Sequence, residues 1–288
     1  LNGGRLTPAT ELDVPTTQKE YVFDRQVYDR RVYRGFGRPR HDDPLQFGPN
    51  IVDWPKMGPL PENLLLKVAS VIHDPVTTTD ELIPSGDTSS YRSNPLKLAE
   101  FTLSRKDPGY LARAKAFQEL ERQRLMLLTE GGPADALQEA LSAFWAGGQS
   151  TPEEFRNLIR DTGLATVIFA VKPGDGSARE QAASCQKVLG GQANIALEYA
   201  TKRYRSNLIN WGMLPFTIGK ESADDIAVDD LIYIAGIRRA TSSGAEDIPA
   251  HIIHKGERKP LQLRLAGLSR EDREIILAGS LINYYAMK

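Results

Sequence analysis

The residues best suited to chemistry in this sequence lie in one heptapeptide, residues 174–180, which reads Gly-Asp-Gly-Ser-Ala-Arg-Glu. Ser177 and Glu180 have the Ser-x-x-Glu spacing of a capping box, which predicts that Ser177 is the N-cap of a helix. The glycines allow a sharp turn and leave backbone amides uncovered. A helix N-terminus with bare amides, a hydroxyl and the guanidinium of Arg179 favours an anion, most simply a carboxylate or a phosphate.

The elements on either side of the heptapeptide would hold it at a strand-to-helix turn. Residues 164–171 form a continuous apolar run rich in β-branched side chains, which is typical of a strand buried on both faces. Residues 178–189 are mostly good helix formers, and Gly190-Gly191 would end that helix. The loop lacks the Lys-Ser/Thr ending of a Walker phosphate loop, and Gly-x-Gly alone does not identify a dinucleotide fold. An ordinary glycine-rich turn stays open as the alternative.

Three further stretches follow the heptapeptide in a fixed order: Leu189-Gly190-Gly191, Asn207-Leu208 and Gly212-Met213-Leu214-Pro215. In order and spacing, the heptapeptide and these stretches resemble the C-terminal swivelling domain of the aconitase family. That family reads Gly-x-Gly-Ser-Ser-Arg-Glu-His-Ala, Leu-Gly-Gly, Asn-Leu and Gly-Leu-Leu-Pro.

A second block of residues supports the resemblance. Residues 78–86 read Thr-Thr-Asp-Glu-Leu-Ile-Pro-Ser-Gly and are followed by Tyr91-Arg92. They are similar to the family's Thr-Thr-Asp-His-Ile-Ser-Pro-Ala-Gly and Tyr-Arg-Gly-His, with the Asp-to-Arg spacing preserved. Residues 278–283 are similar as well, so the resemblance covers residues 60–288.

The resemblance implies an α/β fold: an aconitase-type swivelling β/β/α domain over residues 61–288, preceded by an extended N-terminal arm or interdomain linker at residues 1–60. Hydrophobic periodicity predicts the elements within it. A helical insertion is expected over about residues 108–162, starting strongly at Thr151-Pro152. The other expected elements are strands at 64–72, 193–197, 230–234, 248–254 and 260–265, and helices at 199–211 and 270–286.

Composition excludes several classes of function. Lys plus Arg number 36 and Asp plus Glu number 37, so no overall charge directs the chain to nucleic acid. No apolar stretch approaches the roughly 20 residues that span a bilayer, and no secretory signal is visible, which predicts a cytoplasmic protein without membrane contact.

The residues that usually bind metals are few and scattered. Cys185 is the single cysteine, and His251 and His254 would lie on opposite faces of a strand. No metal site is therefore expected in this chain.

The first residue, Leu1, is not a methionine, which predicts a processed or truncated chain. The resemblance implies that this chain is the C-terminal part of a larger enzyme or a separately made subunit. The resemblance implies that preceding domains carry a [4Fe-4S] cluster and the general acid. The expected partner is therefore the N-terminal, cluster-bearing aconitase domains or subunit. This chain alone is expected to bind no cofactor and to be inactive.

The resemblance also assigns roles to residues. Ser177 matches the catalytic base, Arg179 and Arg92 would bind substrate carboxylates, and Asp80 would orient a histidine of the missing domains. Gly176 and Ala178 would complete the substrate-binding turn. A serine hydroxyl can act as a base only if amides and a cation stabilise its alkoxide, which the turn and Arg179 could supply. The expected substrate is a hydroxy-di- or tricarboxylic acid, which the enzyme dehydrates and rehydrates.

Three departures from the family pattern bear on the substrate. Ala178 replaces the second serine of Ser-Ser-Arg, Glu81 replaces a histidine, and Ile83 replaces a later serine. Losing two hydroxyls that would bind carboxylates predicts a substrate other than citrate or isocitrate. A non-catalytic aconitase paralogue, acting as an RNA-binding or regulatory module, is the alternative. Its local support is the segment 19–40, where arginines alternate with aromatic residues in a way that can bind single-stranded nucleic acid.

Overall fold

The computed structural model describes residues 3–8, 11, 21–31, 37–44, 46–132, 134–145 and 151–288. These divide into two compact units, Leu1–Gln46 and Phe47–Lys288, and each unit is considered by itself. The first unit contains a short helix, α1 (Gln26–Arg31), where the sequence predicted an extended arm. Residues 19, 20 and 32–36 of the arginine- and aromatic-rich segment, and Leu1, lie outside the described residues.

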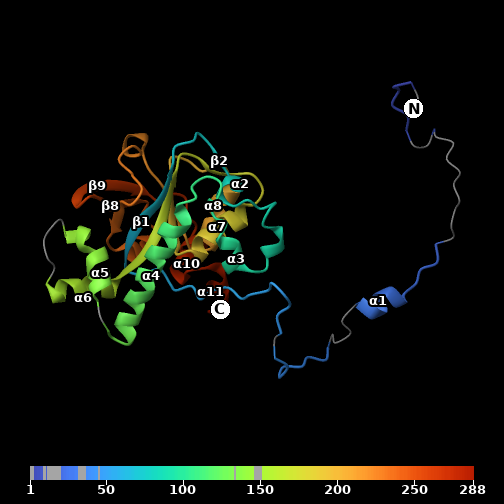
Figure 1. Ribbon diagram of the computed structural model, residues 1–288, viewed down its shortest axis with the longest axis horizontal. Helices are drawn as coiled ribbons and strands as arrows, with labels where there is room; N and C mark the ends of the chain where they lie inside the picture. The colour runs from blue at the N-terminus through green and yellow to red at the C-terminus, as the bar shows by residue number, and fades with distance from the viewer. Residues whose placement is uncertain are drawn as a thin grey trace. The chain divides into compact units, whose positions relative to one another are not determined.

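Strands of the second unit close into a mixed barrel (Figure 1). Around the barrel the order is β1 (Asn63–Ile72), β3 (Thr162–Ala170), β5 (Gly191–Ala196), β6 (Leu214–Thr217), β9 (Glu257–Arg264), β8 (Asp247–His254) and β7 (Leu231–Ile234). Pairing is parallel from β1 through β3 and β5 to β6, and antiparallel elsewhere. The expected α/β class is confirmed, as are the six strands predicted within the barrel; β6 was not predicted.

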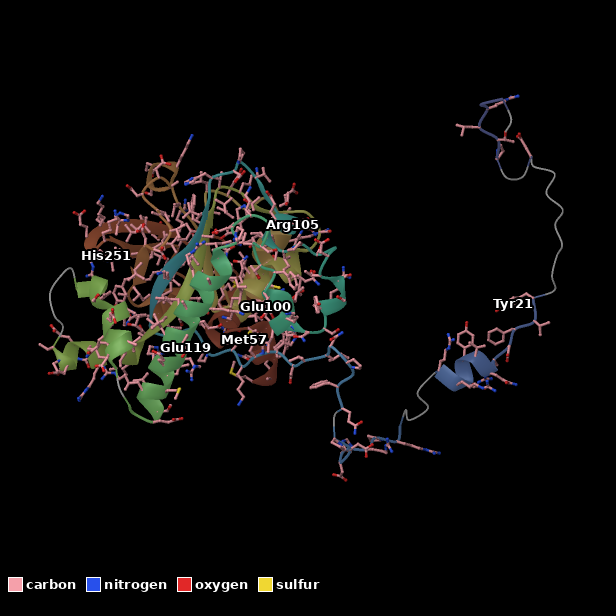
Figure 2. The ribbon with its side chains drawn as sticks, in the orientation of Figure 1. Tyr21, Met57, Glu100, Arg105, Glu119 and His251 are labelled. Carbon is pink, nitrogen blue, oxygen red and sulfur yellow. The ribbon has the colours of Figure 1, made fainter. Side chains whose placement is uncertain are left out.

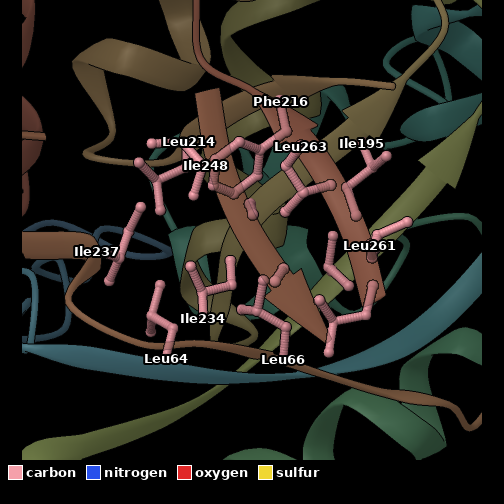
Figure 3. Packing of buried hydrophobic residues seen from close by; sticks show 14 of the residues in the cluster. Leu64, Leu66, Ile195, Leu214, Phe216, Ile234, Ile237, Ile248, Leu261 and Leu263 are labelled. Carbon is pink, nitrogen blue, oxygen red and sulfur yellow. The ribbon is translucent and has the colours of Figure 1, made fainter. Parts of the chain in front are cut away.

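The side chains of β1 alternate between two hydrophobic clusters, one on each face of the strand. Leu64 and Leu66 point into the barrel, where they join buried apolar side chains from other elements (Figure 3), and Val68 belongs to the same cluster. Leu65 packs on the opposite face, in a cluster under the helices that follow. Successive side chains of a strand point to opposite faces, so a strand covered on both sides must be apolar throughout. The same reasoning explains β3, which is buried at every residue.

The helical insertion covers the outer face of β1 and β3. It consists of α4 (Tyr110–Thr129), α5 (Asp135–Ala140) and α6 (Pro152–Asp161), as predicted. Thr151 caps α6 in a capping box with Glu154, and Pro152 occupies the first turn. In Figure 1, α4 lies along β1. No helix in the described parts of the chain is long and apolar enough to cross a membrane.

The remaining helices pack on the barrel and on one another. They are α2 (Thr79–Leu82), α3 (Pro95–Ala99), α7 (Arg179–Val188), α8 (Lys202–Asn210), α9 (Ile237–Ser243), α10 (Arg270–Ala278) and α11 (Leu281–Ala286). The prediction of one closing helix over residues 270–286 was wrong. Gly279 has a left-handed φ of 89° that ends α10, and Ser280 then caps α11.

The break at Gly279 coincides with very close backbone packing. A Cβ atom at Gly279 would lie 2.0 Å from the carbonyl oxygen of Gly58, and one at Gly212 would lie 2.1 Å from the carbonyl oxygen of Gly279. Asn283 also donates a hydrogen bond from Nδ2 to the carbonyl oxygen of Met57, at 2.8 Å. The segment before β1, the end of α8 and the closing helices therefore meet where Gly212 and Gly279 leave no space for a larger residue, whereas a Cβ atom at Gly58 would meet nothing within 4 Å.

Candidate functional site

The two sequence blocks that carry the motifs lie side by side. Strand β4 (Pro173–Asp175) pairs in parallel with β2 (Thr77–Thr78), and neither short strand was predicted. Immediately beyond this pairing, the hydroxyl of Thr79 accepts a hydrogen bond from the backbone N–H of Ala178, at 3.3 Å. The fold thus places the heptapeptide directly against the Thr-Thr-Asp block.

Two glycines make this close approach possible. Gly174 and Gly176 have φ values of 96° and 117°, in the region that side-chain-bearing residues avoid. A Cβ atom at Gly174 would lie 2.3 Å from the ring of Tyr204, and one at Gly176 would lie 2.4 Å from Oγ1 of Thr79. Both the backbone conformation and the lack of space therefore require glycine at these positions.

The predicted capping box at Ser177 is wrong. Helix α7 begins at Arg179, its N-cap is Ala178, and no side chain caps it. The carboxylate of Glu180 accepts a hydrogen bond from Nε1 of Trp211, at 3.1 Å, instead of turning back to the N-cap. Ser177 lies one residue before the N-cap and is exposed. Its hydroxyl makes no hydrogen bond within the described chain, so it is available to a ligand.

Arg179 is the first residue of α7, and its guanidinium has no hydrogen-bond or ion-pair partner among the described residues. The residue is partly buried, and its Nε atom is fully buried yet makes no hydrogen bond to the described residues. No ion pair to Arg179 is formed within that same part of the chain either. A buried donor left without a partner costs free energy, and a bound anion would remove that cost. The helix N-terminus adds a favourable field for the same negative charge.

Asp80 lies beside this turn, next to Thr79 in α2, and is exposed. One of its oxygens pairs with Arg105 at 2.9 Å, and Arg105 also pairs with Asp87. Arg92 follows a short 3-10 helix (Ser89–Tyr91) and is exposed. In the described structure Arg92 makes no hydrogen bond or ion pair to the heptapeptide. The structure therefore brings Asp80 to the turn and leaves Arg92 without a direct link to it.

Glu81 and Ile83 have structural roles at the two positions where they depart from the family pattern. The carboxylate of Glu81 accepts hydrogen bonds from the N–H and the hydroxyl of Thr78, at 2.7 and 2.9 Å, in a capping box for α2. Burial raises the pKa of Glu81, but the bonds from Thr78 and Lys106 outweigh it and hold that pKa below its ordinary value. Ile83 is completely buried among apolar side chains, so it does not face an open site.

A buried polar network holds α7 in place behind the turn. The hydroxyl of Tyr204 donates to Oδ1 of Asn194 at 2.8 Å, and Gln186 of α7 donates to Tyr204 at 3.0 Å. Asn194 in turn donates to Gln186 at 2.7 Å, which closes the network. Thr201, the N-cap of α8, donates from its hydroxyl to the carbonyl oxygen of Gly174 at 3.1 Å. Satisfied networks of this kind fix side chains and backbone in one arrangement.

Sequence reasoning missed the residues that position the turn. Thr79 stands inside a recognised block, and its hydroxyl could have been considered as an acceptor for a neighbouring loop. Tyr204 and Thr201 carry no local signal, because their roles depend on the packing of α8 against β4.

Metal-binding groups do not gather in the described parts of the chain. No three side chains of His, Cys, Asp or Glu are placed there to hold an ion. Burial raises the pKa of the Cys185 thiol to about 12, far from the thiolate that metals require. His254 makes a 2.6 Å contact from Nδ1 to the buried carboxylate of Asp230.

Comparison with known proteins found matches to part of the chain. Residues 151–221 match the family model described as the aconitase C-terminal domain. The chain is 32% identical over 118 residues to a protein named as a proposed mitochondrial aconitate hydratase of Aspergillus fumigatus, and 31% identical over 142 residues to one of the same name from Emericella nidulans. These matches cover 40% and 48% of this chain, but only 14% and 18% of the two relatives.

A solved structure is also similar to this chain. The crystal structure of 3-isopropylmalate dehydratase from Methanocaldococcus jannaschii superposes with a TM-score of 0.45 at 21% sequence identity. The superposition covers 78% of this chain and 94% of that one.

Proposed function

We propose that this chain supplies the substrate-binding turn and the catalytic base of an aconitase-like hydro-lyase, because residues 151–221 match the family model described as the aconitase C-terminal domain. Such an enzyme dehydrates and rehydrates a hydroxy-di- or tricarboxylic acid. The observation that carries the proposal is that a serine and an arginine, both without side-chain partners in the described chain, stand together at the start of α7. An exposed serine hydroxyl stands two residues from a partly buried guanidinium whose Nε has no partner in the described chain.

In this proposal Ser177 removes the proton from the substrate carbon beside a carboxylate. The developing charge on Oγ would be stabilised by Arg179 and by the first amides of α7, which have no partners within the helix. Arg179 would also bind one substrate carboxylate in a planar, two-bond arrangement. Arg92 would reach a second carboxylate of the bound substrate from its exposed position.

The partner in this proposal is a cluster-bearing domain or subunit that closes over the turn, with this chain as the swivelling part. An iron–sulfur cluster needs several thiolates, and Cys185 is the only cysteine of this chain and is buried with a raised pKa. The residues of this chain therefore do not fit a [4Fe-4S] cluster, and we assign the cluster to the partner. Asp80 would orient a partner histidine once it is released from Arg105.

The substrate proposal now depends on Ala178 alone, because Ile83 is buried. A hydroxyl lost from a site that binds a charged oxygen costs roughly 1.5–3 kcal/mol, or about 10- to 150-fold in affinity. A methyl group at residue 178 suits a substrate with fewer carboxylates or with an apolar substituent. We therefore propose a hydroxy acid other than citrate as the preferred substrate.

The test is an assay of the protein together with its cluster-bearing part, over a panel of hydroxy acids, by absorbance of the unsaturated product. We expect turnover of a non-citrate acid, and loss of that turnover in Ser177→Ala. Ser206→Ala, an exposed serine on α8, is the matched control and should keep full activity. Full activity in Ser177→Ala would contradict the assigned base. Inactivity on every acid would favour the non-catalytic paralogue.

A further inference from the structure

A cavity of about 670 Å³ lies near the other end of α7, away from the turn. Its walls come from residues 55–61 before β1, one side of α4, the first residues of β3, and the connection from α7 to β5. Figure 2 labels Met57 and Glu119, from two of these walls. The volume is within the range of small-molecule sites in proteins.

The polar groups at the α7 wall are nearly all committed to protein partners. Gln118 donates from Nε2 to the carbonyl oxygen of Val188 at 2.8 Å, and Gln192 donates to the carbonyl oxygen of Gly212 at 2.7 Å. The exception is Lys187, which lines the cavity and is 9% exposed. Its ammonium has one hydrogen bond in the described chain, to Oε1 of Gln192 at 2.7 Å, although it can donate three.

No carboxylate of the residues that the structure describes pairs with Lys187, although two line the same cavity. Glu119 is paired with Arg122 at 2.6 Å, and Glu121 with Arg124 at 2.6 Å. The remaining charged groups that line the cavity are Lys56 of the segment before β1 and Lys115 of α4; the first residues of β3 and the residues of β5 that line it bring no charge. A cation buried without a counter-charge is costly. Burial accordingly lowers the pKa of Lys187 to about 7.

The other lining side chains are mostly apolar, and they come from all four walls. They include Met57, Pro59, Leu125, Leu164 and Val188. A ligand that completes this cavity must therefore combine an apolar body with one negative group. The apolar area of the walls suits an aliphatic body better than a compact di- or tricarboxylate, so this site differs in kind from the turn at Ser177.

We propose that this cavity binds a small amphiphilic anion, an aliphatic body ending in a carboxylate or a phosphate, whose charge pairs with the ammonium of Lys187. The ligand brings the counter-charge that the protein lacks, and its tail covers the apolar wall from α4 and the segment before β1. Binding draws a proton onto Lys187, because the ion pair favours the charged amine. Affinity therefore falls about tenfold for each pH unit above 7.

The experiment is isothermal titration of the whole chain with octanoate and with octyl phosphate, and with octanol as the neutral probe, from pH 6.5 to 9. We expect at least one anion to bind more tightly than octanol, with the stated loss above pH 7. Lys187→Met should weaken anion binding about 10- to 100-fold. Lys187→Arg should keep anion binding and lose the pH dependence, because arginine stays charged.

The matched control is Lys259→Met, at an exposed position on β9 away from the cavity, which should bind as the unaltered chain does. Thermal unfolding of each variant checks that it is folded before titration. Octanol binding as tightly as both anions, unchanged anion binding in Lys187→Met, or no binding of either anion at millimolar concentration would overturn the proposal. The titration needs no cluster and no turnover, so its outcome is separate from that of the hydro-lyase assay.

Discussion

The two ends of helix α7 carry positive side chains in opposite settings. At its N-terminus Arg179 is partly exposed, and the helix field there favours a bound anion. At its C-terminus Lys187 is in a field that favours a cation, yet burial lowers its pKa to about 7. The two settings differ in exposure. Arg179 is partly exposed and has no partner in the described chain, whereas Lys187 is buried and must lose its proton or gain a counter-ion.

The largest expected effect on stability comes from adding a side chain at Gly174, where the turn has no space for one. Gly174→Ala would place a methyl group 2.3 Å from the ring of Tyr204, on a backbone with a φ of 96°. Strain and overpacking together predict a loss of about 3–5 kcal/mol in the free energy of unfolding. Chemical denaturation would measure it. Gly86→Ala, where a Cβ meets nothing within 4 Å, is the control and should change stability little.

At the other end of the helix, Lys187→Met should stabilise the protein. Between pH 7 and 10.5 the unfolded chain holds a proton on this amine that the folded chain lacks, so stability falls as the pH drops through that window. The expected gain in the variant is up to about 4 kcal/mol at pH 7, offset by about 1 kcal/mol for the lost bond to Gln192.

The pH dependence separates this effect from ordinary repacking. The stability difference between Lys187→Met and the unaltered chain should shrink as the pH rises toward 10.5. Denaturation curves at pH 7, 8.5 and 10 would show it. A difference that stays constant across that series would contradict the assigned desolvation of Lys187.

Two buried threonines beside the turn allow a matched pair of substitutions. Thr79→Val removes the acceptor for the N–H of Ala178 and should cost about 1–2 kcal/mol. Thr77→Val, in the adjoining strand, replaces a buried hydroxyl that has no partner in the described residues, and should be neutral or stabilising. Equal costs for both variants, measured by thermal unfolding, would show that the hydrogen bond to Ala178 does not hold the turn.

The smallest effect is expected from the exposed pair between Arg105 and Asp80. Arg105→Ala should change the free energy of unfolding by less than about 1 kcal/mol, because both side chains are more than half exposed. A larger loss, seen in the same denaturation assay, would mean that this arginine fixes α2 and with it the position of Thr79.

Much of the fold could be predicted because its signals are local. Apolar runs identified β1 and β3, and the Thr151-Pro152 start identified α6. The missed features depend on distant partners. The two-residue strand β2 exists only because β4 lies beside it, nearly a hundred residues later in the chain.

The site shows the same limit at the level of single side chains. Ser177 and Glu180 satisfy a capping box in sequence, but Trp211 binds the glutamate, and the capping position passes to Ala178. Asp80 was recognised by its neighbours in the chain, whereas its partner Arg105 was not, since no local pattern joins residues 25 positions apart. Motif spacing thus located the turn, but it could not predict which distant residues bind the side chains of Glu180 and Asp80.

The close packing of Gly58, Gly212 and Gly279 also determines how the second unit would respond to force. The segment at Met57 and the closing helix at Asn283 are joined directly, by backbone contact and a hydrogen bond. Tension applied through the residues before β1 would pass into the closing helices before it reached the strands of the barrel. A protein whose domains rotate against one another could therefore pull on this unit through its linker without distorting the turn at Ser177.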